Sequence, residues 1–256
     1  MGNLLRMDLY RMRKAKSFWV CLILAFLFGL LSTPGVKLMT VVAGLVSNEK
    51  NLFPATADLS GIIKAPFPIL NAMLALLSVN SFFYADVENG YIKNIAGQMP
   101  KRGYTIFSKF LAVIPHNLLF IIVGVGGNLI GTIVFQKIIV DGAVLEACGI
   151  LLLKLLLIQS LCTILLLVTA TFQSKSFGTV LAVLFGLGLL FLVYTGIDAG
   201  LDQLWPKKSF SIVSYMPDQL LNSASPDAVR SLAVSAVTIV IFLFPSIRIF
   251  DKKDVK

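Results

Sequence analysis

Long apolar runs separated by short polar stretches dominate the sequence. The runs lie near 17–33, 67–86, 107–134, 147–172, 178–197 and 229–247. A helix of about 20 apolar residues crosses the roughly 30 Å hydrocarbon core of a bilayer. Backbone N–H and C=O groups in lipid must bond within the protein, and helices meet that need. The pattern therefore predicts an all-α membrane protein with six transmembrane helices in one domain, 1–256.

Residues 1–16 have a helical periodicity of another kind. The apolar side chains recur at i, i+4 and i+7, as Leu5, Leu9 and Met12. The basic side chains fall on the opposite side, as Arg6, Arg13 and Lys14. This pattern is typical of an amphipathic helix that lies at a membrane interface. The helix sets the topology by its charge alone, or it also contacts a cytoplasmic partner.

Composition and charge agree with this organisation. Apolar residues make up 57% of the chain and charged residues 14%, so lipid is expected to cover part of the surface. Fourteen Lys and Arg fall on the side that holds both termini and the 87–109 loop, against seven on the other side. Basic segments are retained in the cytoplasm during insertion, so both termini are expected there. The net charge of +9 then reflects topology, and no nucleic-acid partner is expected.

The charged loop at 82–109 separates the second and third apolar runs. Apolar side chains recur in it at helical spacing, as Val87, Tyr91, Ile92 and Ile95. Charged side chains accompany them, as Asp86, Glu88 and Lys93. A short helix with such stripes can dock in a groove on another protein, and Pro100 would end it. A solvated positive-inside loop would explain the basic residues but not the acidic pair at the membrane edge.

The order of residues in this loop resembles that of type-2 ABC-transporter permeases. The positions that carry the resemblance are Asp86, Gly90, Lys93, Pro100, Arg102 and Lys109. The basic start, the six spans and the tail at 247–255 extend it over nearly the whole chain. In that family the loop supplies a cytoplasmic coupling helix that receives the motion of a separate ATPase.

The resemblance implies a permease subunit of a bacterial cell-membrane exporter. It implies two copies of a cytoplasmic ATPase, a second permease that is identical or related, and an amphipathic or antimicrobial peptide or a drug-like molecule as substrate. The residues that it assigns to ATPase coupling are Asp86, Val87, Glu88, Gly90, Tyr91, Lys93, Ile95, Pro100, Arg102 and Lys109.

Nucleotide and catalytic motifs are missing from the sequence. The phosphate-binding GxxxxGK loop is absent, so ATP and Mg²⁺ are expected on the partner subunit and no cofactor on this chain. No HExxH or GxSxG motif occurs, and one histidine cannot build a metal site alone, so no enzyme activity is expected. Gly127 and Gly131 form a small-xxx-small pair that permits close helix contact, within one subunit or between two.

Three polar residues inside apolar runs are candidates for a substrate path. Lys154 lies within the fourth run, where its charge is unfavourable unless it snorkels to the outer interface, lines a polar path or pairs with a carboxylate. His116 and Asn117 lie in the third run, where interior hydrogen bonding or a role in proton transfer is open to the histidine.

Two other functions are compatible with a multi-span chain. A non-transporting scaffold or sensor would use the loop only to dock a partner. An ion-driven transporter would place carboxylates in mid-span, whereas the acidic residues here fall at or beyond the predicted span ends.

Overall fold

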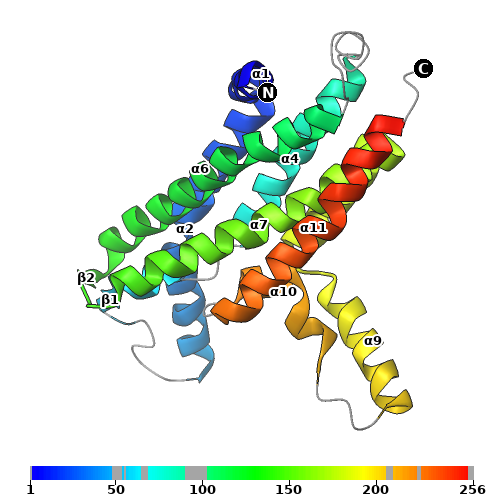
Figure 1. Cartoon of the computed structure of the whole chain (residues 1–256). Helices are drawn as coiled ribbons and strands as arrows, with labels where there is room; N and C mark the ends of the chain where they lie inside the picture. The colour runs from blue at the N-terminus through cyan, green and yellow to red at the C-terminus, as the bar shows by residue number, and fades with distance from the viewer. Residues whose placement is uncertain are drawn as a thin grey trace.

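The computed structural model describes residues 2–47, 54, 56–64, 69–89, 103–205, 210–223 and 226–252. Its larger helices are α1 (Gly2–Lys14), α2 (Lys16–Ser47), α4 (Ile69–Glu88), α6 (Gly103–Phe135), α7 (Val144–Phe172), α8 (Lys175–Gly186), α9 (Phe191–Leu204) and α11 (Ala228–Lys252) (Figure 1). Short elements connect them: β1 (Thr56–Asp58), α3 (Leu59–Lys64), β2 (Lys137–Ile139), η1 (Ile212–Tyr215) and α10 (Pro217–Asn222).

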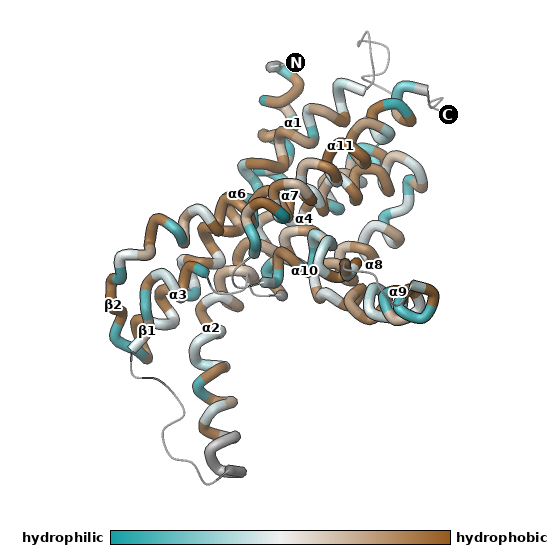
Figure 2. Tube along the Cα trace, turned by 60° about the horizontal axis from the view of Figure 1, so that its bottom comes forward, coloured by the Kyte–Doolittle hydropathy of each residue, from teal (hydrophilic) through white to brown (hydrophobic). Residues whose placement is uncertain are grey.

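Five of the described helices are long and apolar enough to cross a membrane, or six if α8 and α9 together form one span. The five are Lys16–Val41, Leu70–Glu88, Gly103–Phe135, Val144–Phe172 and Ala228–Asp251. Apolar residues form extended brown stretches along them (Figure 2). The prediction of an all-α, multi-pass membrane protein is therefore confirmed.

The helices form a bundle with two distinct ends (Figure 1). One end, called the α1 end, holds α1, the end of α4, the start of α6 and the end of α11. The Gly103 N–H donates to Asp251 Oδ1 at 2.5 Å there, which joins α6 to α11. At the other end, the strand end, β1 pairs in parallel with β2, with Ala57 opposite Ile138.

Helix α7 forms the centre of the bundle. It contacts α11, α6, α4, α3, α8 and α10. Its inward side chains Leu157, Leu161 and Leu165 are fully buried. By contrast, α2 and α11 expose apolar side chains along their length, among them Leu38, Val237 and Val240. In a bilayer these exposed side chains are the ones that lipid would cover.

The first long helix continues well beyond the predicted span 17–33. Helix α2 passes through Pro34 and ends at Ser47. Proline lacks an N–H, so the helical bond to the Leu30 carbonyl cannot form. That carbonyl instead lies against Gly131 of α6, so closely that a β-carbon at Gly131 would overlap it.

Glycines form the contact between α2 and α6. A β-carbon at Gly127 would lie 2.6 Å from the Phe26 carbonyl oxygen. Polar pairs flank the glycines: Ser32 Oγ donates to Asn128 Oδ1 at 2.7 Å, and the hydroxyls of Thr33 and Thr132 lie 2.9 Å apart. The small-xxx-small pair of α6 therefore packs against a helix of its own subunit.

We expect Gly127→Ala to destabilise the protein, because the methyl group would force α2 and α6 apart at a backbone contact. The loss should be about 1–3 kcal/mol, as for other overpacked contacts. Gly126→Ala is the matched control, since a β-carbon there meets nothing within 4 Å and alanine favours helix. The measurement is thermal denaturation in detergent. Equal midpoints for the two variants would contradict this packing.

The predicted span 178–197 is not one straight helix. Helices α8 and α9 meet at a 73° bend. Gly188 has φ +65° in the bend, a backbone conformation that glycine adopts without strain. Before the bend, Gly186 packs directly on the backbone of Met73 in α4. After it, the Asp198 carboxylate accepts bonds from the Ser211 hydroxyl and the backbone N–H groups of Ile212 and Val213, which ties α9 to η1.

Candidate functional site

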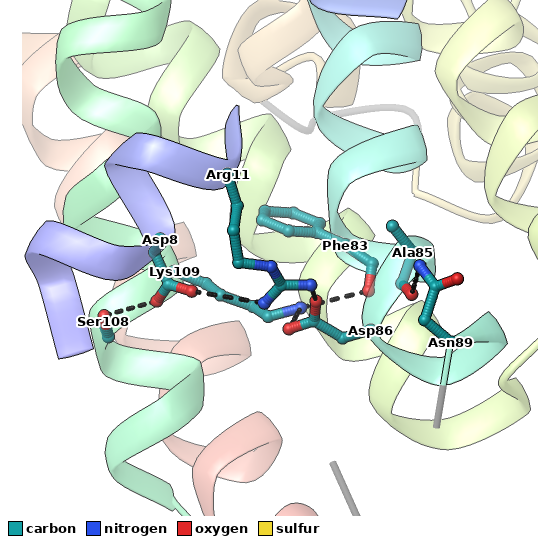
Figure 3. A network of polar contacts seen from close by, with 8 residues as sticks. All are labelled: Asp8, Arg11, Phe83, Ala85, Asp86, Asn89, Ser108 and Lys109. Carbon is teal, nitrogen blue, oxygen red and sulfur yellow. Dashed lines mark hydrogen bonds and ion pairs between the residues drawn. The ribbon is translucent and has the colours of Figure 1, made fainter. Parts of the chain in front are cut away.

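A buried group of charged side chains joins three helices at the α1 end. It comprises Asp8 and Arg11 of α1, Asp86 of α4, and Ser108 and Lys109 of α6, and we call it the charge cluster (Figure 3). Asp8, Asp86, Ser108 and Lys109 are all buried. Buried charges are expensive unless they are paired, so the arrangement of these groups decides what they can do.

Asp86 is the central carboxylate of the charge cluster. Its Oδ2 lies 2.8 Å from Lys109 Nζ, and its Oδ1 accepts a hydrogen bond from the Arg11 guanidinium. The Lys109 ammonium also donates to the Phe83 carbonyl at 3.1 Å and lies over the rings of Phe82 and Phe83. Two cations from two other helices therefore converge on one carboxylate of α4 (Figure 3).

Asp8 supplies the second carboxylate. Its Oδ2 accepts a hydrogen bond from the Ser108 hydroxyl at 2.5 Å, and its Oδ1 lies 3.8 Å from the Arg11 guanidinium. Burial raises the pKa of the Asp8 carboxyl, while the Ser108 hydrogen bond and the Lys109 charge oppose that rise. Asp8 and Asp86 balance the charges of Arg11 and Lys109, so the charge cluster is electrically neutral when all four groups are ionised.

The chemistry of this arrangement is that of a joint rather than of a reaction centre. Apart from the Asp8–Arg11 contact within α1, each ion pair and hydrogen bond of the charge cluster crosses between helices. Helices α1, α4 and α6 therefore cannot separate at this end without leaving a buried charge unpaired. Helix α4 ends at Glu88, two residues beyond Asp86, and the side chain of the next residue, Asn89, donates to the Ala85 carbonyl. A force applied to the end of α4 would therefore reach α1 and α6 through Asp86.

The structure brings together two of the residues predicted to couple to an ATPase, Asp86 and Lys109. Val87 is half-buried, and the exposed Glu88 lies 3.9 Å from the Lys175 ammonium at the start of α8. The other predicted coupling residues lie outside the described residues: Gly90, Tyr91, Lys93, Ile95, Pro100 and Arg102.

Sequence reasoning missed Asp8, Arg11 and Ser108 as members of a site. It placed Leu9 on the apolar face of an interfacial helix, and Leu9 is 37% exposed in the structure, while the face against α6 carries Asp8. A polar residue occupies that face because Ser108 and Arg11 satisfy its carboxylate. One signal was present in the sequence, since Asp8 is the single carboxylate of the basic segment 1–16.

His116 and Asn117 belong to a second polar group inside the bundle. The Asn117 amide oxygen can only accept, so His116 Nδ1, 3.1 Å away, donates to it and Nε2 accepts from the Ser78 hydroxyl, also at 3.1 Å. The Asn117 amide donates to Gln159 Oε1 at 3.0 Å, and the Gln159 amide donates to the Phe110 carbonyl. These bonds link α4, α6 and α7, and substrate contact with His116 would require some of them to open.

Lys154 is enclosed by protein and does not extend to the surface. Its side chain is among the largest that are fully buried, and Nζ donates to the Lys64 carbonyl at 3.1 Å. Lys64 is the last residue of α3, where carbonyl groups lack helical donors and a cation is favourable. The Lys64 ammonium in turn pairs with Glu146 at 3.0 Å. The buried lysine thus joins α7 to the short helix α3.

Metal ligands do not gather in the part of the chain that the structure describes. No group of three or more His, Cys, Asp and Glu side chains there could hold a metal ion. The charge cluster, the His116 group and the Lys154 contact each join helices. In comparisons with known proteins, no family model and no curated protein matches the chain.

Proposed function

We propose that the protein is the permease subunit of an ATP-driven exporter of the type-2 ABC class. A separate cytoplasmic ATPase, present in two copies, would supply the energy. A second permease, identical or related, would complete the pathway across the bacterial cell membrane. The substrate class proposed is an amphipathic or antimicrobial peptide or a drug-like molecule.

The charge cluster is the observation that supports this proposal most directly. A subunit moved by a separate ATPase needs a rigid link between the docking segment and the spans. Asp86 lies three residues before Asn89, at the end of the helix that leads into the predicted docking loop. Its ion pairs with Arg11 and Lys109 attach that end to α1 and α6. A plain positive-inside loop has no need for such a buried joint.

The mechanism follows from that link. Closure of two ATPases on ATP would move the docked loop, with Tyr91 and Ile95 in the contact. The motion would pass to α4 at Asp86 and from there to α6 and α1. The His116 group joins α4 and α6 to α7, the central helix, so a displacement of α4 would reach the middle of the bundle. In the proposed topology, both termini and the α1 end face the cytoplasm.

Copurification tests the proposal. The full chain is expressed with a P-loop ATPase encoded in an adjacent reading frame and is purified in detergent through a tag on the permease. We expect the ATPase to be retained, and its hydrolysis in lipid vesicles to rise several-fold when a transported peptide is added. The ATPase alone is the control for basal hydrolysis. Retention without any stimulation by candidate substrates would favour a scaffold or sensor, and no retention would refute the ABC assignment.

A further inference from the structure

Helix α1 presents a basic and aromatic face away from the bundle. Its exposed side chains include Arg6, Tyr10, Arg13 and Lys14, which follow one another at i, i+4, i+7 and i+8 and so lie on one side of the helix. Leu4, Asp8 and Met12 occupy the opposite side and are buried. Lys16, the first residue of α2, is a further exposed cation and follows the end of α1 by two residues.

Among the residues that the structure describes, no acidic side chain balances these cations on the exposed side. Asp8 is the one carboxylate between residues 2 and 20, and it is buried in the charge cluster. Within the described ranges, none of Arg6, Arg13, Lys14 and Lys16 forms an ion pair with a carboxylate. Lys14 lies over the Tyr10 ring at 5.8 Å, so two side chains of this face already contact each other.

An apolar surface begins at the start of α2, directly after the cations in the sequence. Trp19 is 48% exposed, and its indole N–H donates to the Arg13 carbonyl at 2.8 Å, which fixes the ring against the end of α1. Val20 and Ile23 follow on α2 and are exposed as well. These residues belong to a helix long and apolar enough to cross a membrane. Cations, an interfacial tryptophan and an apolar stripe therefore occur in the order that a phospholipid presents phosphate, glycerol and acyl chains.

We propose that this face, defined by Arg6, Tyr10, Arg13, Lys14, Lys16 and Trp19, binds the headgroup of an anionic phospholipid. The charge of the face selects an anion, because it carries cations without carboxylates. The exposed apolar side chains of α2 favour a lipid over a soluble acidic protein, since a protein partner would have to leave Val20 and Ile23 in the bilayer. The charge cluster holds α1 in place and turns its single carboxylate inward, which keeps the exposed face purely basic. This inference does not depend on the proposed transport function.

Fluorescence quenching of Trp19 tests the site in the full chain. The protein has two tryptophans, so Trp205→Phe leaves Trp19 as the sole emitter. The Trp205→Phe variant is reconstituted in phosphatidylcholine vesicles that contain increasing amounts of either brominated phosphatidylglycerol or brominated phosphatidylcholine. We expect the anionic lipid to be preferred at Trp19 by about fivefold or more. Replacing Arg6, Arg13, Lys14 and Lys16 by Gln should bring the ratio close to one.

Two controls separate a site from general charge attraction. The first removes four positive charges assigned by sequence to the opposite membrane side, with Gln at Lys137, Lys207, Lys208 and Arg230, and should keep the preference at Trp19. The second uses Trp19→Phe, so that Trp205 reports on lipid far from α1 and should show no change when the four α1 cations are replaced. Equal quenching by both lipids would overturn the proposal, as would a preference that survives loss of the four cations.

The rival occupant of this face is an acidic surface of the ATPase. The variant without the four cations tests this alternative. If it keeps the lipid preference but no longer copurifies the ATPase, the face belongs to that protein and the lipid site is overturned. Because the quenching experiment contains no ATPase, failure of the exporter assignment would leave its result unaffected.

Discussion

Asp86→Asn should lower the free energy of unfolding by about 3 kcal/mol or more, the size expected when one partner of a buried ion pair is removed. The variant keeps the shape of the side chain but leaves Lys109 buried and Arg11 partly buried beside a neutral group. Asp8 is the remaining carboxylate of the charge cluster, and it already accepts from Ser108. The measurement is denaturant unfolding in detergent micelles, with the loss of helix content as the signal.

Glu88→Gln is the matched control for Asp86→Asn. Glu88 lies two residues further along α4, but its side chain is 59% exposed and lies 3.9 Å from Lys175, which is 51% exposed. Exposed pairs of this kind contribute about 0–1 kcal/mol, so this variant should resemble the wild type. Combining Asp86→Asn with Lys109→Met removes both charges and should restore part of the lost stability. Equal losses for Asp86→Asn and Glu88→Gln would show that the charge cluster is not a stabilising joint.

Tyr91→Asp combined with Ile95→Asp should abolish copurification of the ATPase while the permease remains in the membrane at normal abundance. The two side chains lie on the apolar stripe of the predicted docking helix, and charges placed there would have to lose water on docking. The loss should exceed tenfold in recovered ATPase, because the proposal places both side chains at the centre of the interface. The measurement is pull-down from detergent with the amounts of permease held equal.

Arg102→Ala serves as the control for charge in the same loop. A rim charge in water contributes little to a protein interface, so this variant should retain most of the ATPase. Full retention by the double aspartate variant would mean that the loop is not the docking element. The exporter proposal would then lose its main support, because this loop carries the most specific resemblance of the chain to ABC permeases.

The two discussed variants probe different parts of one proposed transmission path. The Tyr91 and Ile95 pair tests whether force enters the permease at the loop, whereas Asp86 tests whether the end of α4 is fixed to α1 and α6. If the exporter proposal holds, a complex that keeps the ATPase bound to a permease without the Asp86 ion pairs should hydrolyse ATP without export. Such uncoupling would distinguish a mechanical role of the charge cluster from a contribution to stability alone.

The sequence by itself determined the class of the protein and most of its helices. Apolar runs long enough to cross a bilayer admit few structures other than helices, because backbone groups in lipid must bond within their own segment. The runs at 107–134 and 147–172 correspond closely to α6 and α7. Charged residues at 82–109 likewise marked the segment that supplies Asp86 and Lys109 to the charge cluster.

Only the tertiary structure decided which polar groups meet and where helices bend. Asp8 and Ser108 are 100 positions apart, and hydropathy carries no information about partners at that distance. The run at 178–197 is uniformly apolar, so its pattern could not reveal a 73° bend that depends on Gly188 and on the close contact of Gly186 with Met73. The sequence left open whether Gly127 and Gly131 make a contact within one subunit or between two. In the structure they pack against the backbone of α2 in the same subunit. Periodicity records which residues avoid water, whereas pairing and bending depend on surfaces that exist only once helices pack.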